Sequence, residues 1–113
     1  MENKKTTTIY PASARGLKEL GQRLKDARLR RRFSMETVSI RAAISRPTLY
    51  KIEKGDPTVS IGAYIQVLRV LNLVDDLSLI AKEDALGRSL QDELLPHRKR
   101  APRRKVSTGD SNG

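Results

Sequence analysis

The sequence contains no cysteine and no tryptophan, and aromatic residues make up only 4% of its 113 residues. The lack of cysteine excludes disulfide bonds and cysteine-ligated zinc, and it suits a reducing compartment. The core must therefore consist mainly of aliphatic side chains. No apolar run reaches the length of a membrane-spanning helix, and the first residues lack the apolar stretch of a signal peptide. We expect a cytoplasmic protein that makes no contact with a membrane.

The residues that catalysis usually needs are also scarce. The single histidine, His97, has no second histidine or cysteine to share a metal and no evident carboxylate or nucleophile as a partner. Zinc requires three or four ligands, and no glycine-rich loop follows a strand to hold a phosphate group. The sequence therefore predicts no enzyme, no catalytic residue, no metal site and no cofactor.

Positive charge, in contrast, is present in excess, with a formal net charge of +10. Residues 15–54 contain twelve lysines and arginines against four acids, residues 55–95 contain three against seven, and residues 96–113 contain six against one. A basic protein of this kind is suited to a polyanion, and nucleic acid is the first candidate. The separation of the charges predicts two different surfaces, with the acidic one available to a second partner.

Apolar periodicity and capping residues predict an all-α fold. Expected helices run from about Ser13 or Gly16 to Arg31, from Met35, after the cap Ser34, to Ala42, from the cap Ser45 to about Lys54, from the cap Ser60 to about Asn72, and from about Asp75 to Ala81. The clearest stripe is Ile61, Tyr64, Ile65, Leu68 and Leu71, and the last helix is expected to bury Leu77 and Ile80. These five helices form one compact domain over residues 15–82. It follows a flexible segment over 1–14 and precedes a short helical extension over 83–95 and a disordered basic tail over 96–113.

The second and third of these helices are joined by only a few residues, so they cannot run antiparallel in full contact. So short a connection sets the two helices at a steep angle, as in a helix-turn-helix motif. We expect the space between the two helices to be filled by the side chains of Ile44, Leu49 and Ile52. The outward side chains of the third helix suit a major groove, because Arg and Lys donate to guanine and Pro or Tyr contacts a thymine methyl group. They are Arg46, Pro47, Thr48, Tyr50, Lys51 and Lys54.

The stretch LGQRLKDARLRRRFSMETVSIRAAISRPTLYKIEKG resembles the Cro/C1-type (XRE) helix-turn-helix repressors, which have the lambda-repressor fold. The resemblance covers about residues 17–81 and implies a bacterial, nucleoid-associated regulator that binds double-stranded DNA. By position it implies base contacts from Ser45, Arg46, Pro47, Tyr50 and Lys51. It implies phosphate contacts from Ser34, Arg41, Thr48 and Lys54, and a structural ion pair between Arg28 and Glu53.

Two positions depart from the family pattern. The family usually has a glutamine at the start of the second helix, where its amide holds a phosphate, and this chain has Met35, which has no donor. The turn usually has a glycine, and this chain has Ala43, for which a positive φ angle carries a cost. The sequence thus puts this phosphate contact and the geometry of the turn in question.

A narrower resemblance extends over EKGDPTVSIGAYIQVLRVLNLVDDLSLIA, LGRSLQD and the basic tail, which are similar to HipB-like antitoxins. It implies a homodimer that represses its own toxin–antitoxin operon and binds a HipA-type serine/threonine kinase. An alternative interpretation is a protein-interaction module that neutralises such a kinase, with DNA binding secondary. Binding of single-stranded RNA is a third interpretation, and the low aromatic content argues against it because base stacking needs rings.

Overall fold

The structure is a computed structural model, and it describes residues 8–95. These residues form α-helices and one short 3₁₀ helix, and they contain no strand. The elements are α1 (Pro11–Arg30), α2 (Met35–Ala42), α3 (Arg46–Glu53), α4 (Ile61–Val70), η1 (Val74–Leu79) and α5 (Ala85–Leu94). The predicted all-α fold is confirmed. The expected tail over 96–113, with His97, and the first seven residues lie outside the described part.

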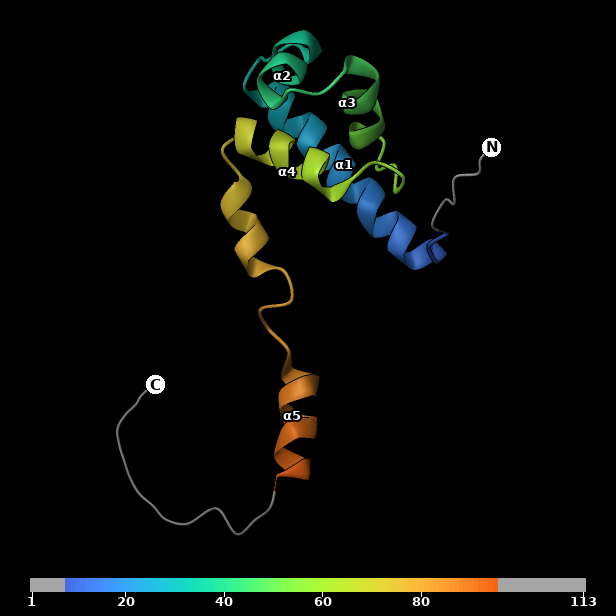
Figure 1. Ribbon diagram of the computed structural model, residues 1–113, viewed down its shortest axis with the longest axis vertical. Coiled ribbons are helices and arrows are strands. Elements are labelled where there is room, and N and C mark those ends of the chain that lie inside the picture. The colour runs from blue at the N-terminus through green and yellow to red at the C-terminus, as the bar shows by residue number, and fades with distance from the viewer. Residues whose placement is uncertain (1–7, 96–113) are drawn as a thin grey trace, which may run out of the picture. The chain divides into compact units, whose positions relative to one another are not determined.

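The chain divides into two units, one ending at Leu77 and one beginning at Ser78. In the first unit, α1 packs against α3, and α2 packs against both α3 and α4 (Figure 1). Aliphatic side chains and one tyrosine from all four helices form the core, as the shortage of aromatic residues requires. Its buried members are Leu24, Ala27, Val38, Ala42, Leu49, Ile52, Tyr64, Val67, Leu68 and Leu71.

Serine caps begin three of these helices, as predicted. The hydroxyls of Ser34, Ser45 and Ser60 each accept a hydrogen bond from the backbone N–H three residues ahead. Each bond satisfies a donor that the helix itself leaves unpaired. The first helix differs from its prediction, because it begins earlier, at Pro11. Proline suits the first position of a helix, since its φ angle is already helical and its missing N–H would be unpaired there.

Left-handed residues end the first four helices in the same way. At each end, a residue with positive φ is followed by a residue whose N–H donates back to a carbonyl in the last turn of the helix. This hydrogen bond satisfies a carbonyl that would otherwise have no partner. The four left-handed residues are Arg32, Ala43, Gly55 and Asn72.

The segment after α4 departs from prediction, because it forms the 3₁₀ helix η1 rather than an α-helix from Asp75 to Ala81. Left-handed residues at Asn72 and Ala81 limit it to a short run, and short runs favour 3₁₀ geometry. Ile80 lies after η1 and is 69% exposed, so its predicted burial is wrong. Ile61 is also exposed, because it is the first residue of α4 and lies beyond the packed turns.

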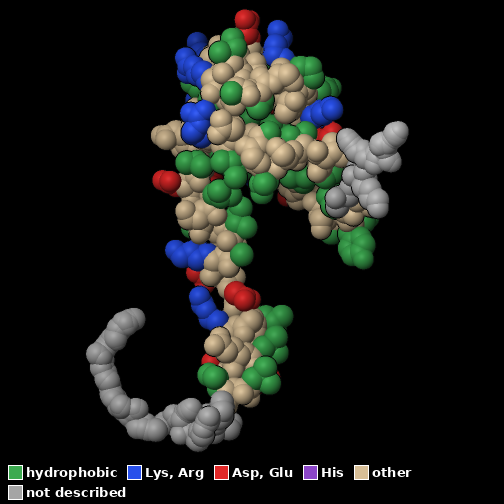
Figure 2. Space-filling model, in the orientation of Figure 1, with side chains coloured by type: hydrophobic (Ala, Val, Ile, Leu, Met, Phe, Trp, Pro, Cys, Tyr) green, Lys and Arg blue, Asp and Glu red, His purple; other side chains and the backbone are tan. Residues whose placement is uncertain are grey.

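The described part of the second unit contains α5, which Asp84 caps by accepting a hydrogen bond from the N–H of Gly87. This helix was expected in the extension after residue 82. Leu86, Leu90 and Leu94 recur at intervals of four residues and are exposed, so hydrophobic side chains gather along one side of α5 (Figure 2). A search of residues 8–95 finds no helix long and apolar enough to cross a membrane.

Candidate nucleic-acid interface

Helix α3 has one buried face and one exposed face. Leu49 and Ile52 are fully buried in the core, and Ile44, in the turn before α3, packs against it. Tyr50, between them in sequence, is 56% exposed although it is a large hydrophobic residue. The remaining predicted base-contacting side chains are exposed as well: Ser45, Arg46, Pro47 and Lys51. The helix therefore presents a row of polar and aromatic side chains to solvent.

The start of α3 is held by a pair of hydroxyl groups. Ser45 Oγ accepts from the N–H of Thr48 at 3.1 Å and donates to Thr48 Oγ1 at 2.9 Å. Among residues 8–95, the hydroxyl of Thr48 donates to no acceptor in this arrangement, while Ser45 Oγ keeps one unused lone pair. Thr48 can thus donate to a phosphate, and Ser45 can accept from a base amino group.

The same pair of hydroxyls recurs at the start of α2. Ser34 Oγ accepts from the N–H of Thr37 at 3.0 Å and donates to Thr37 Oγ1 at 2.9 Å. Thr37 thus places a second hydroxyl beside Ser34, the predicted phosphate contact at the start of α2. Sequence reasoning missed Thr37, although the repeated spacing of Ser-x-x-Thr at both helix starts was a visible signal.

The turn between α2 and α3 keeps the conformation that glycine usually provides. Ala43 has φ 58° and ψ 43°, which is the left-handed region. Ile44 N–H donates to the carbonyl of Ser39 at 3.0 Å, and this bond closes the turn. The methyl group of Ala43 is therefore tolerated in the left-handed conformation at a cost of about 1–2 kcal/mol, and the closing hydrogen bond of the turn still forms.

The far end of α3 rests on α1 through two glycines. A Cβ atom on Gly21 would lie 2.6 Å from the carbonyl oxygen of Ile52, and a Cβ atom on Gly55 would lie 2.5 Å from the Cα of Lys18. The backbones of the two helices therefore approach closely, and α3 is seated on α1. Sequence reasoning did not single out Gly21, although a glycine in the middle of a predicted helix is unusual enough to suggest close packing.

A buried ion pair holds the same contact about two turns further along α1. Arg28 Nε donates to Glu53 Oε2 at 2.6 Å, and Arg28 Nη2 donates to Glu53 Oε1 at 3.1 Å. Arg28 Nη1 also donates to the carbonyl of Phe33, in the link between α1 and α2. One guanidinium thus joins α1, the end of α3 and the segment that precedes α2.

Three further hydrogen bonds fix the loop after α3. Asp56 Oδ1 accepts from the N–H and the hydroxyl of Thr58, and these bonds lower the pKa of the Asp56 carboxyl group. The hydroxyl of Tyr64, in α4, donates to the carbonyl of Asp56 at 2.8 Å. Burial, with a contribution from the negative charge of Asp56, raises the pKa of Tyr64 to about 12. The loop is therefore tied to the core at the point where α3 ends.

The cationic groups of Arg41 and Lys54, the two remaining predicted phosphate contacts, each lie over an aromatic ring. The guanidinium of Arg41 lies 5.2 Å from the centre of the Phe33 ring, and the ammonium of Lys54 lies 5.3 Å from the centre of the Tyr50 ring. Both cations are exposed, so the rings orient them without removing them from solvent.

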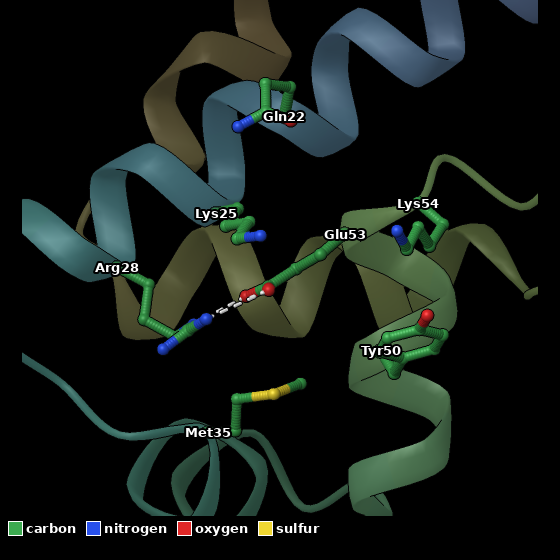
Figure 3. Close-up of a pocket in the computed structure, with 7 residues that line it drawn as sticks. All are labelled: Gln22, Lys25, Arg28, Met35, Tyr50, Glu53 and Lys54. Atoms are coloured by element: carbon green, nitrogen blue, oxygen red, sulfur yellow. Dashed lines mark hydrogen bonds and ion pairs between the residues drawn. The ribbon is translucent and has the colours of Figure 1, made fainter.

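A hollow of about 130 Å³ opens between α1, the start of α2 and α3 (Figure 3). Met35 lies at its edge, at the position where the resemblance places a glutamine. The other lining residues are Gln22, Lys25, Arg28, Tyr50, Glu53 and Lys54. Within residues 8–95, no three His, Cys, Asp or Glu residues lie together as metal ligands would.

Comparison with curated proteins finds no match. Comparison with protein families matches residues 19–79, more than half of the chain, to a helix-turn-helix domain. The matched residues begin in α1 and end at the last residue of η1, so they include the buried ion pair, the turn and the exposed face of α3. The chain therefore belongs to the helix-turn-helix domain family, and this membership indicates DNA binding and a role in the regulation of transcription.

Proposed function

We propose that the protein is a sequence-specific repressor that places α3 in the major groove of double-stranded DNA. The observation that supports this most is the division of α3 into two faces. Arg46, Tyr50 and Lys51 are exposed, while the opposite face is fixed in the core and the end of the helix is seated on α1. A rigid helix with an exposed row of donors and an aromatic ring can read base edges.

Two classes of contact follow from the chemistry of the exposed groups. Arg46, Lys51 and Tyr50 contact bases, with Pro47 and the free lone pair of Ser45 completing the surface. Phosphates are contacted by Lys54, Arg41 and the hydroxyl of Thr48. The hydrogen-bonded hydroxyls of Ser34 and Thr37 contact a phosphate as well. Phosphate contacts position the protein on the duplex, and base contacts specify the sequence.

The protein acts as a homodimer in this proposal. Helix α3 has eight residues and is about 12 Å long, so one copy spans only a few base pairs. Two copies place two such helices in successive major grooves, with half-site centres about 34 Å apart. Sequence specificity then comes from the pair of half-sites.

Selection of bound duplexes from a random pool, at two salt concentrations, tests the proposal. The expected result is an enriched motif with two half-sites about one helical turn apart, retained at the higher salt. Substitution of Arg46, Tyr50 or Lys51 should then change the motif. If no motif is enriched, or if the motif depends on residues 96–113 and ignores these three side chains, the proposal is wrong.

The finer assignment, a HipB-like antitoxin that represses its own operon, rests on the similarity of residues 53–95 and of the basic tail to that subgroup. It predicts that the neighbouring gene encodes a HipA-type kinase and that the selected motif lies upstream of both genes. An enriched motif that is absent from this promoter would remove the autoregulatory part and leave DNA binding intact.

A second candidate function is neutralisation of such a kinase, with DNA binding secondary. It is favoured by the exposed leucines and acids of α5, which are features of a protein-binding surface, and, separately, by the exposed acids of η1. Co-purification of the untagged chain with the product of the neighbouring gene tests this candidate. Substitution of Asp75, Asp76, Asp92 and Glu93 should abolish co-purification and leave DNA binding unchanged.

A further inference from the structure

More positive than negative side chains line the hollow beside α3, and α1 provides some of the positive ones. Lys25, Arg28, Glu53 and Lys54 line it, so its charged groups have a net charge of two positive units. Glu53 and Arg28 are paired through both carboxylate oxygens and satisfy each other. Glu53 is the one acid in the lining, and neither lysine forms an ion pair with it.

Nothing close to Lys25 on α1 neutralises it. The positions three and four residues away, where a helical partner would lie, are Gly21, Gln22, Arg28 and Leu29. The nearby Asp26 accepts a hydrogen bond from Gln22 Nε2 at 2.9 Å. Among the described residues, neither Lys25 nor Lys54 forms an ion pair.

The orientation of the two lysines points to a ligand between them. Figure 3 shows their ammonium groups directed into the space between α1 and α3, on either side of Glu53. Lys25 is partly buried, which limits the water that can screen its charge, and Lys54 is held against the ring of Tyr50. Two cations that face one hollow repel each other, and an anion between them would relieve this repulsion.

We propose that this hollow binds a phosphate of the DNA backbone, with Lys25 of α1 as a contact that adds to Lys54 at the C-terminal end of α3. The inference rests on the proposed DNA-binding function, because the hollow lies beside the exposed row of α3. It extends the interface from the helix-turn-helix to the first helix. Lys25 thus helps to set the depth of α3 in the groove and carries no sequence information itself.

Salt dependence of DNA binding by the full chain tests the proposal. The plot of log K against log [salt] has a negative slope, and each phosphate neutralised adds about 0.9 to its magnitude. Lys25→Gln should reduce the magnitude of this slope by about 0.9 on both the selected duplex and an unrelated one. Lys25→Arg should leave the slope unchanged. Arg23→Gln is the matched control, since it removes one charge from an exposed residue about 160° around α1 from Lys25. Equal slope changes for Lys25→Gln and Arg23→Gln would overturn the proposal.

A second arm separates this inference from the proposed function. Titration of the wild-type chain with inorganic phosphate, followed by amide NMR shifts, should move the signals of Gln22, Lys25 and Tyr50, and Lys25→Gln should abolish the movement. If the wild type binds no duplex but shows these shifts, the DNA-binding proposal fails and the anion site stands. If the wild type binds DNA, yet Lys25→Gln changes neither the slope nor the shifts, only the site is wrong. The melting temperature of each variant confirms that it is folded.

Discussion

Arg28 and Glu53 are 25 residues apart in sequence, yet they form a two-pronged ion pair with an Nε–Oε2 distance of 2.6 Å. Both side chains are more than nine-tenths buried. The pair joins the last turn of α1 to the last residue of α3, close to the exposed face that we propose reads DNA. The direction of α3 therefore depends on a polar contact as well as on core packing.

We predict that Glu53→Ala lowers the free energy of unfolding by about 3–5 kcal/mol, because it leaves a buried guanidinium without its partner. The double variant Arg28→Met, Glu53→Leu should recover most of this loss, since it removes both charges. Urea unfolding followed by circular dichroism measures both values. A double variant no more stable than Glu53→Ala would show that the pair has a role beyond mutual neutralisation.

Gly21 provides the second test of how α3 is seated. Gly21→Ala should lower the free energy of unfolding by about 1–3 kcal/mol, because the added methyl group meets backbone atoms of Ile52, Glu53 and Gly55. Gly16→Ala is the matched control, since no atom lies within 4 Å of its added Cβ. That variant should be more stable than the wild type by about 0.5–1 kcal/mol. Similar effects of the two substitutions in thermal unfolding would contradict the close approach.

Much of the fold follows from local signals in the sequence. The boundaries of α2 are predicted because a serine cap begins the helix and apolar spacing fills it, and both signals act over a few residues. The close contact at Gly21 and the hydrogen bond between the hydroxyls of Ser34 and Thr37 were missed, because each depends on a neighbour that only the folded chain or the cap provides. The 3₁₀ form of η1 was missed for a related reason, since left-handed residues on either side of it limit its length.

Ala43 offers a gain in stability. Its left-handed conformation costs an alanine about 1–2 kcal/mol and costs a glycine almost nothing. Glycine also lowers the free energy of unfolding by about 0.4–1 kcal/mol, because it gives the unfolded chain more conformational freedom. Ala43→Gly should therefore raise the free energy of unfolding by about 0.5–1 kcal/mol, seen as a higher urea midpoint with an unchanged slope. A lower midpoint would show that the methyl group contributes packing that outweighs the strain.

Lys51 lies in α3 and Lys54 follows its last residue, and we predict that substitutions of these two lysines have different effects. Lys51→Ala should weaken binding to the selected duplex by about 1–3 kcal/mol and relax one base preference, because it removes a base contact. Lys54→Ala should weaken binding to all duplexes about equally, because it removes a phosphate contact. Affinities for the selected duplex and for single-base variants of it, at one salt concentration, distinguish the two patterns. If Lys54→Ala changes the base preference and Lys51→Ala does not, the assignment of these residues is reversed.

Tyr64 makes the stability of the fold sensitive to high pH. Its pKa is raised from 10.0 to about 12 in the folded chain, because its ring is buried and Asp56 is near. The folded chain therefore holds the Tyr64 proton more tightly than the unfolded chain does. This contribution to stability is fully present below pH 10 and is lost as the pH rises through about 12, with a total change of about 3 kcal/mol. In Tyr64→Phe, which cannot ionise, the free energy of unfolding should fall less steeply than in the wild type between pH 10 and 12. Parallel pH profiles of the two proteins in urea unfolding would show that the hydroxyl of Tyr64 ionises equally in both states.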